Sequence, residues 1–265
     1  MAGSHVNNNK NSHLYSSKLV PQRTRSRLVS RARLISQFSP SNVQPRLTLL
    51  VAPAGYGKST LLSQRVDKVQ DSSIAWLGLD DSDNNLDTFL EYLWAAFEPL
   101  LPSENIDELS AHYSAAPGAS YKLRLNVLFS AIEELNKPFQ LVLDDFHVIA
   151  KDKTLQCIDW LINFMPSEMS LLIASRQLPT LPCLTVLKSQ GELQEIPAQQ
   201  LNFTLKETHS FLSIDKQVNL SEDSVLSLFR RTEGWVGATQ LALHALHQQK
   251  NQNEKTLIFW KVTST

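Results

Sequence analysis

The chain has 265 residues, a net charge of −1 and two cysteines, Cys157 and Cys183. This length can bury a sizeable core in one large domain, or in one domain with a small second one. The cysteines lie in apolar surroundings and form neither a disulfide framework nor a metal-ligand spacing, which favours a reducing cytoplasm. No apolar run approaches transmembrane length and no signal peptide is recognisable, so no membrane association is expected.

Charge is distributed unevenly along the first half of the chain. The stretch from Met1 to Val66 contains no acidic residue, whereas Asp71 to Ser110 contains ten acidic residues and no Lys or Arg. The basic front would help to hold a nucleotide, form a nucleic-acid arm, or be a solvated segment neutralised by the acidic stretch. Residues 1–17 are polar and rich in Asn, and we expect them to be disordered.

Apolar runs of strand length alternate with runs of helical period as far as residue 205. Strands are predicted at Arg46–Ala52, Ile74–Leu79, Phe139–Leu143 and Ser170–Ala174. Helical stripes are predicted within Leu61–Val69, Leu86–Phe97 (after a cap region at Asn84-Asn85), Leu125–Leu135 and Leu155–Met165. This alternation predicts an α/β fold, a parallel sheet with helices on both faces.

The pattern becomes entirely helical after Leu205. Three short helices are predicted at Leu205–Leu212, Ser221–Thr232 and Trp235–His247, with a break at Gly234. Lys255–Thr265 resembles the start of an element whose partner is missing. The predicted domains are a disordered N-terminus (1–17), a P-loop nucleotide-binding α/β domain (18–205) and a helical lid subdomain (206–265).

A Gly-rich loop lies between the first predicted strand and the helix that follows it. Ala52–Thr60 fits the phosphate-loop pattern G-x-x-x-x-G-K-[ST] at every fixed place but the first, where Ala replaces Gly. A small residue suffices at that place. Gly55 and Gly57 let the backbone curl close to phosphates, and N–H groups at a helix N-terminus favour an anion.

The loop also carries the side chains that a nucleotide requires. Lys58 would reach the β- and γ-phosphate oxygens of ATP. Ser59 would place its hydroxyl on Mg²⁺, with Thr60 as its neighbour and substitute. The sequence therefore predicts a site for ATP or ADP with Mg²⁺.

Polar residues at the ends of later strands extend this site. Asp144 and Asp145 follow the apolar run Leu141-Val142-Leu143, in the form of a Walker B strand. Asp144 would hold Mg²⁺, usually through water, and Asp145 would polarise a water for attack on the γ-phosphate. Arg176 ends the next strand and would sense the γ-phosphate, or else form a surface ion pair.

Structural roles are predicted for two other polar sites, His147 and Asp80-Asp81. His147 follows the acid pair, and a structural histidine is favoured over a catalytic base. Asp80-Asp81 would approach the nucleotide edge or cap the following helix, and the cap is favoured.

In this order the motifs resemble those of STAND-class signal-transduction ATPases and, more narrowly, the N-terminal ATP-binding region of MalT-type, LuxR-family large transcriptional activators. The segments that carry the resemblance extend from residue 17 to about 247: Ser17–Pro21, Leu28–Leu34, Ala52–Thr60, Trp76–Asp80, Leu141–His147, Ser175–Pro179, Gln199–Phe203 and Glu233–Trp235. The phosphate loop alone is generic, whereas the ordered set is specific.

The resemblance implies that Leu28–Leu34 lies over the adenine, with Val29 in contact and Arg31 supporting the site. It implies that ATP, with an inducer, drives self-association, and that slow hydrolysis by a weak ATPase resets the switch. In the family, DNA binding belongs to a C-terminal helix-turn-helix domain. This chain ends before such a domain, as a fragment or as a short relative would.

Two other functions remain open from the sequence. One is a P-loop phosphotransferase or kinase that acts on a small molecule, although the region after Arg176 is poor in groups that would bind an acceptor. The other is a nucleotide-independent interaction module with a decayed site.

Overall fold

The structure is a computed structural model. It describes residues 14–21, 28–38, 45–68, 73–102, 104, 106–114, 120–214 and 220–248. Most of the predicted disordered N-terminus and the predicted element Lys255–Thr265 fall outside this part of the chain. The chain divides into two compact units, which we call the sheet unit (1–22, 44–49 and 70–194) and the loop unit (23–43, 50–69 and 195–265). The predicted domain boundaries stay a prediction.

Five strands form one sheet. They are β1 (Leu47–Val51), β2 (Ser73–Gly78), β3 (Phe139–Asp144), β4 (Met169–Ser175) and β5 (Leu193–Pro197). Their order is β2-β3-β4-β1-β5, and β3 pairs in parallel with both β2 and β4. The four predicted strands are confirmed to within two residues. The sequence does not reveal β5, because this edge strand is mostly half-buried or exposed and lacks a continuous apolar run.

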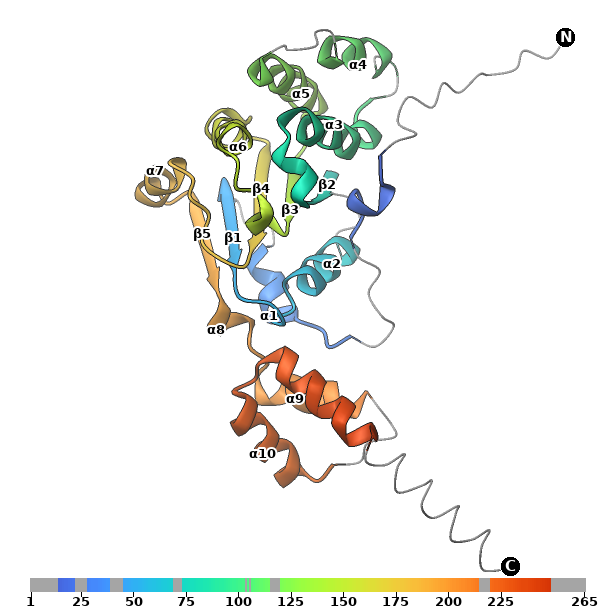
Figure 1. The fold of residues 1–265 in the computed structure, drawn as a ribbon, viewed down its shortest axis with the longest axis vertical. Coiled ribbons are helices and arrows are strands. Elements are labelled where there is room, and N and C mark those ends of the chain that lie inside the picture. The colour runs from blue at the N-terminus through green and yellow to red at the C-terminus, as the bar shows by residue number, and fades with distance from the viewer. Residues whose placement is uncertain are drawn as a thin grey trace, which may run out of the picture. The chain divides into compact units, whose positions relative to one another are not determined.

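Helices of the sheet unit pack beside these strands (Figure 1). They are α3 (Leu86–Phe97), α4 (Ile106–Ser114), α5 (Tyr121–Leu135), α6 (Asp152–Phe164) and α7 (Cys183–Gln190), with the 3-10 turns η1 (Ser16–Lys18), η3 (Asp81–Asn84), η4 (Glu98–Leu100) and η6 (Phe146–Val148). α3 packs against β2, α5 and α6, and the rings of Phe97 on α3 and Phe139 on β3 stack at 4.8 Å. The core therefore lies between the sheet and these helices.

Two predicted caps are confirmed. The Asn85 side chain accepts hydrogen bonds from the backbone N–H groups of Asp87 and Thr88 at the start of α3. The Asp80 side chain accepts a hydrogen bond from the Ser82 N–H group at the start of η3. The prediction that Asp80-Asp81 caps the following helical turn is thereby confirmed.

The loop unit contains short helices and the phosphate loop. Its elements are α1 (Ala32–Ile35), η2 (Ser36–Phe38), α2 (Lys58–Lys68), α8 (Ala198–Leu201), α9 (Leu205–Ser213), α10 (Glu222–Thr232) and helical residues 236–248. Here α9 and α10 pack against each other (Figure 1). Side chains of Thr204 and Ser221 cap these two helices, and the three helices predicted after residue 205 are confirmed.

None of the helices in the described residues combines the length and the apolarity that crossing a membrane requires.

A buried lysine ties the segment 14–21 to the rest of the sheet unit. Lys18 Nζ lies 2.6 Å from Asp83 Oδ2 and 3.1 Å from Asp80 Oδ1, and 4.0 Å from the centroid of the Tyr92 ring. The Asp83 side chain is fully buried, and burial raises its pKa even though Lys18 opposes the shift. The pair therefore holds the segment in place, and Asp83 depends on its cation.

We expect Lys18→Met to lower the free energy of unfolding by about 3–5 kcal/mol at neutral pH, because it leaves a buried carboxylate without its partner. The loss should shrink as the pH falls toward about 4. Without Lys18 the folded-state pKa of Asp83 rises further above its unfolded value. Protonation of Asp83 then favours the folded state, so the variant recovers stability as the pH falls. Urea denaturation at several pH values measures both effects.

Asp80→Asn is the matched control, since its side chain is 54% exposed and Asn keeps the cap. It should change the stability by less than about 1 kcal/mol. Equal losses for the two variants would contradict the assignment of Asp83 as the essential partner.

Candidate functional site

The loop between β1 and α2 has the backbone of an anion nest. Gly55 has φ +82° and Gly57 has φ +76°, which lie in the left-handed region that favours glycine. The helix α2 begins at Lys58, directly after the second of these glycines. Successive backbone N–H groups at such a loop and helix start can bind phosphate oxygens.

The loop lysine is held inside the loop. Lys58 is 7% exposed, and its Nζ donates to the carbonyls of Ala52 at 2.7 Å and Pro53 at 3.1 Å. Ala52 is buried, which agrees with the expectation that its place in the motif needs a small residue. Ser59 is half-buried and Thr60 is exposed, both in the first turn of α2.

The segment predicted to lie over the adenine is clamped to α2 by one amide side chain. Gln64 Nε2 donates to the Val29 carbonyl at 2.9 Å, and Gln64 Oε1 accepts from Arg31 N–H at 3.2 Å. Val29 and Gln64 are both buried. Sequence reasoning missed Gln64, because a single Gln in an amphipathic helix carries no motif.

Arg31 is occupied by groups of the protein. Its guanidinium donates to the Leu201 carbonyl at 2.6 Å, lies 3.3 Å from Glu207 Oε1 and stacks over the Phe203 ring at 4.8 Å. Burial lowers the pKa of Arg31 to about 10, although Glu207 opposes that shift. These contacts join the 28–34 segment to α8 and α9.

A tryptophan at the start of the last helical segment packs on the phosphate loop. Gly237 N–H donates to the Gly55 carbonyl at 2.8 Å, just inside helical residues 236–248. The Trp235 indole nitrogen lies 3.1 Å from where a Cβ on Gly55 would be, and the Tyr56 ring centroid is 6.2 Å from that of Trp235. The sequence predicts a break at Gly234, a helix from Trp235 and a segment Glu233–Trp235 that shares in the family resemblance, but not the contact of Trp235 with the phosphate loop.

A tight backbone contact holds this turn. Phe203 N–H donates to the Gly234 carbonyl at 2.7 Å, and Gly234 has φ +76°. A Cβ on Gly234 would lie 2.1 Å from the Phe203 carbonyl oxygen. Only glycine fits at this position, on conformational and on steric grounds.

The acid pair lies at the carboxyl end of β3 in the sheet unit. Asp144 is 3% exposed, and its Oδ1 accepts from Asp145 N–H at 2.9 Å. Asp145 has φ +56°, and its Oδ1 lies 3.8 Å from Nδ1 of His147. Arg176 directly follows the neighbouring strand β4 and is exposed. Because β3 and β4 are parallel, these ends belong to the same edge of the sheet.

The predicted site residues therefore form two sets. The loop unit contains Val29, Arg31, Gly55, Gly57, Lys58, Ser59 and Thr60, and the sheet unit contains Asp144, Asp145 and Arg176. Within the described residues no group of three or more His, Cys, Asp or Glu side chains could hold a metal ion. Carboxylates, such as that of Asp144 in the sheet unit, are among the ligands that Mg²⁺ usually takes in proteins, together with the phosphates of a nucleotide.

Comparisons with known proteins give relatives and a fold. No family model matches the chain. Proteins named HTH-type transcriptional regulator MalT from Yersinia pestis (strain Pestoides F) and from Yersinia enterocolitica serotype O:8 are each 32% identical to it over 228 residues. The alignments cover 86% of this chain and 25% of each relative, so the chain spans about a quarter of their length.

Among solved structures, a Walker-type ATPase of Pyrococcus abyssi superposes with a TM-score of 0.54 at 13% identity, covering 92% of this chain and 78% of that chain. The predicted P-loop NTPase fold is thereby confirmed. The resemblance to MalT-type regulators over this region is also confirmed.

We expect Gly234→Ala to lower the free energy of unfolding by about 3 kcal/mol or more, because left-handed strain adds to a clash with the Phe203 carbonyl. Gly191→Ala is the matched control. Gly191 has φ +74°, but a Cβ there meets nothing within 4 Å, so only the strain of about 1–2 kcal/mol applies. Chemical denaturation of both variants measures the difference, and equal losses would rule out the steric argument.

Proposed function

We propose that this chain binds ATP or ADP with Mg²⁺ and acts as the nucleotide-dependent switch of a MalT-like transcriptional regulator. The observation that carries the proposal is the hydrogen bond of 2.8 Å from Gly237 N–H to the Gly55 carbonyl. It joins the phosphate loop directly to a helical segment, so a change in the loop backbone on nucleotide binding changes the support of that helix. A likeness to the MalT proteins over 86% of the chain supports the regulatory context.

The residues of the loop unit would hold the nucleotide. Lys58 would neutralise charge on the β- and γ-phosphates, and Ser59, with Thr60 as its substitute, would offer a hydroxyl to Mg²⁺. Val29 would contact the adenine, on a segment that Gln64 and Arg31 fix to α2 and to α8.

The residues of the sheet unit would serve hydrolysis. Asp144 would hold Mg²⁺ through water, and Asp145 would accept a proton from the attacking water. Arg176 would stabilise negative charge on the γ-phosphate. The proposed ATPase is weak and acts to reset the switch.

Energetics limit what the single backbone bond can do. Moving a two-state equilibrium from 1:99 to 99:1 requires about 5.5 kcal/mol of discrimination between states. One hydrogen bond contributes about 1 kcal/mol net. The packing of Trp235 on Gly55 and the contacts of the γ-phosphate must therefore supply most of the difference.

The proposal extends to partners. The ATP state would self-associate, an inducer would act with ATP, and DNA would be bound only through a C-terminal domain of the kind found in the family. The location would be the cytoplasm, as the cysteine usage predicts.

We expect ATP–Mg²⁺ and ADP–Mg²⁺ to give different small-angle scattering profiles and different protease patterns. Lys58→Ala should weaken ATP binding by at least about tenfold, because charge-assisted bonds contribute roughly 1.5–3 kcal/mol each. It should also abolish the difference between the two nucleotides. Lys206→Ala, an exposed lysine on α9 of the same unit, is the control and should behave as the parent chain. Identical profiles with ATP and ADP would reject the switch.

Replacing the proposed base tests the hydrolytic step. Asp145→Asn should slow ATP hydrolysis by about 10²-fold or more, the scale of general base catalysis, with little change in nucleotide affinity. Single-turnover hydrolysis and equilibrium binding separate the two effects. Asp107→Asn, an exposed acid in the first turn of α4, is the control. Normal hydrolysis by Asp145→Asn would remove that residue from the proposed role.

A further inference from the structure

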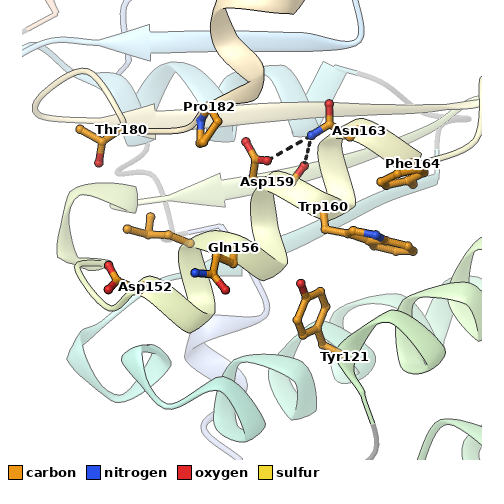
Figure 2. Close-up of a pocket in the computed structure, with 10 residues that line it drawn as sticks. Tyr121, Asp152, Gln156, Asp159, Trp160, Asn163, Phe164, Thr180 and Pro182 are labelled. Atoms are coloured by element: carbon orange, nitrogen blue, oxygen red, sulfur yellow. Dashed lines mark hydrogen bonds between the residues drawn. The ribbon is translucent and has the colours of Figure 1, made fainter.

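The outer face of α6 in the sheet unit lines a hollow of about 450 Å³ (Figure 2). A hollow of this size accommodates a small organic molecule. The inner face of α6 buries Cys157, Ile158 and Leu161 against the core. Residues on the outer face of α6 line the hollow together with Tyr121 of α5 and Pro182, which precedes α7.

Three stacked rings connect the hollow to the core. Trp160 stacks on Phe129 at 5.9 Å with an interplanar angle of 4°, and on Phe164 at 4.7 Å and 27°. Tyr121 meets Trp160 edge-on at 6.3 Å. Phe129 is buried, whereas Phe164 is 60% exposed. The stack therefore presents fixed aromatic surface to solvent within the hollow, as Figure 2 shows for Trp160 and Phe164.

The charged groups that line the hollow are all negative. Its lining contains the carboxylates of Asp152 and Asp159, and no Lys, Arg or His. Asp159 is held in place, because its Oδ1 accepts from Cys183 N–H at 2.8 Å and its Oδ2 accepts from Asn163 Nδ2 at 3.1 Å. Asp152 is exposed at the first position of α6.

The backbone around the hollow is fixed at both ends of α6. Arg46 donates to the carbonyls of Ile162 and Met165 at 2.7 and 2.5 Å, at the last turn of the helix. Asn84 Oδ1 accepts from Lys151 N–H at 3.0 Å, directly before its first turn. The aromatic and acidic groups are thus presented on a rigid element, which lowers the entropy cost of binding.

We propose that this hollow binds a small organic cation with a flat apolar body, of the arylguanidinium or arylammonium class. The carboxylates complement the charge, and the ring faces of Trp160 and Phe164 attract a cation while covering an apolar body. An anion would meet two carboxylates, and a neutral molecule would gain only the aromatic contact. The proposal is independent of nucleotide binding.

Three probes of one shape test the charge requirement on the full chain. Phenylguanidine is a cation at neutral pH, phenylurea is its neutral counterpart, and benzoate is an anion. By calorimetry or ligand-observed NMR, phenylguanidine should bind with a Kd of about 1 mM or lower, as its size allows. Phenylurea should bind at least about tenfold more weakly, because it lacks the charge that the rings and carboxylates attract. Benzoate should not bind.

Two exposed side chains of the hollow locate the site. Phe164→Ala and Asp152→Asn should each weaken phenylguanidine binding by about three- to tenfold. The matched controls are Leu123→Ala, an exposed apolar residue (62%) on α5 outside the hollow, and Asp107→Asn in the first turn of α4. Both controls should leave the affinity unchanged, and all four variants should keep the unfolding midpoint of the parent chain.

Several results would overturn the proposal. They are equal affinity for phenylguanidine and phenylurea, no binding at about 10 mM, or no effect of Phe164→Ala and Asp152→Asn. A fourth probe separates a small molecule from an arginine of a protein partner. If N-acetyl-Phe-Arg-amide binds at least about tenfold more tightly than phenylguanidine, the hollow is a peptide-docking site and the small-molecule assignment fails. Equal or weaker binding of the peptide supports it.

Discussion

The hydrogen bond between Gly237 N–H and the Gly55 carbonyl is the interaction on which the loop unit depends. It is made by backbone alone, between a loop that turns through left-handed glycines and the first turn of a helix. A Cβ on Gly237 would lie 3.2 Å from the Gly55 oxygen, so a side chain there would crowd the bond. Because both residues of this junction are glycines, the helix can come close to the loop. The indole ring of Trp235 can then pack on Gly55.

The 28–34 segment of the loop unit is supported by side chains that are themselves buried. Gln64 satisfies both hydrogen-bonding groups of its amide on the backbone of residues 29 and 31. Arg31 satisfies carbonyl and carboxylate groups on the other side. A buried amide or guanidinium left without partners costs more than the net gain from one bond. The bonds of Gln64 and Arg31 therefore fix the conformation of residues 28–34. A helix as short as α1, with four residues, would not be stable by itself.

Much of the fold follows from the sequence because its strands are continuous apolar runs, which a parallel sheet buries on both faces. β3 and β4 are almost fully buried, and their ends at Asp144 and Ser175 are marked by polar residues. The phosphate loop is recognisable because its chemistry needs glycine and lysine at set places. β5 and α7 were missed because an exposed edge strand and a short helix with mixed polarity resemble a loop in composition.

The parts of the candidate site that were missed act through long-range contacts. Gln64 and Trp235 are ordinary residues of amphipathic or loop sequence, and only folding places them against Val29 and Gly55. No spacing along the chain encodes a bond between positions 64 and 29, or between 237 and 55. Such contacts depend on how helices pack, which local periodicity does not specify.

Several cations of the basic front lie in the described residues, and their contacts show how that part of the chain uses them. Six of its cations lie in the described residues and contact groups of the protein: Lys18, Arg31, Arg33, Arg46, Lys58 and Arg65. Four of the six are at most 8% exposed, so a freely solvated segment is wrong for this part. The acidic stretch neutralises one of them, since Lys18 pairs with Asp80 and Asp83. Arg31, Arg33, Arg46 and Lys58 donate to backbone carbonyls, and Arg65 lies over the Phe38 ring. These residues therefore support the fold of the unit to which each belongs, and among them the loop lysine Lys58 is the cation that the motif assigns to a nucleotide.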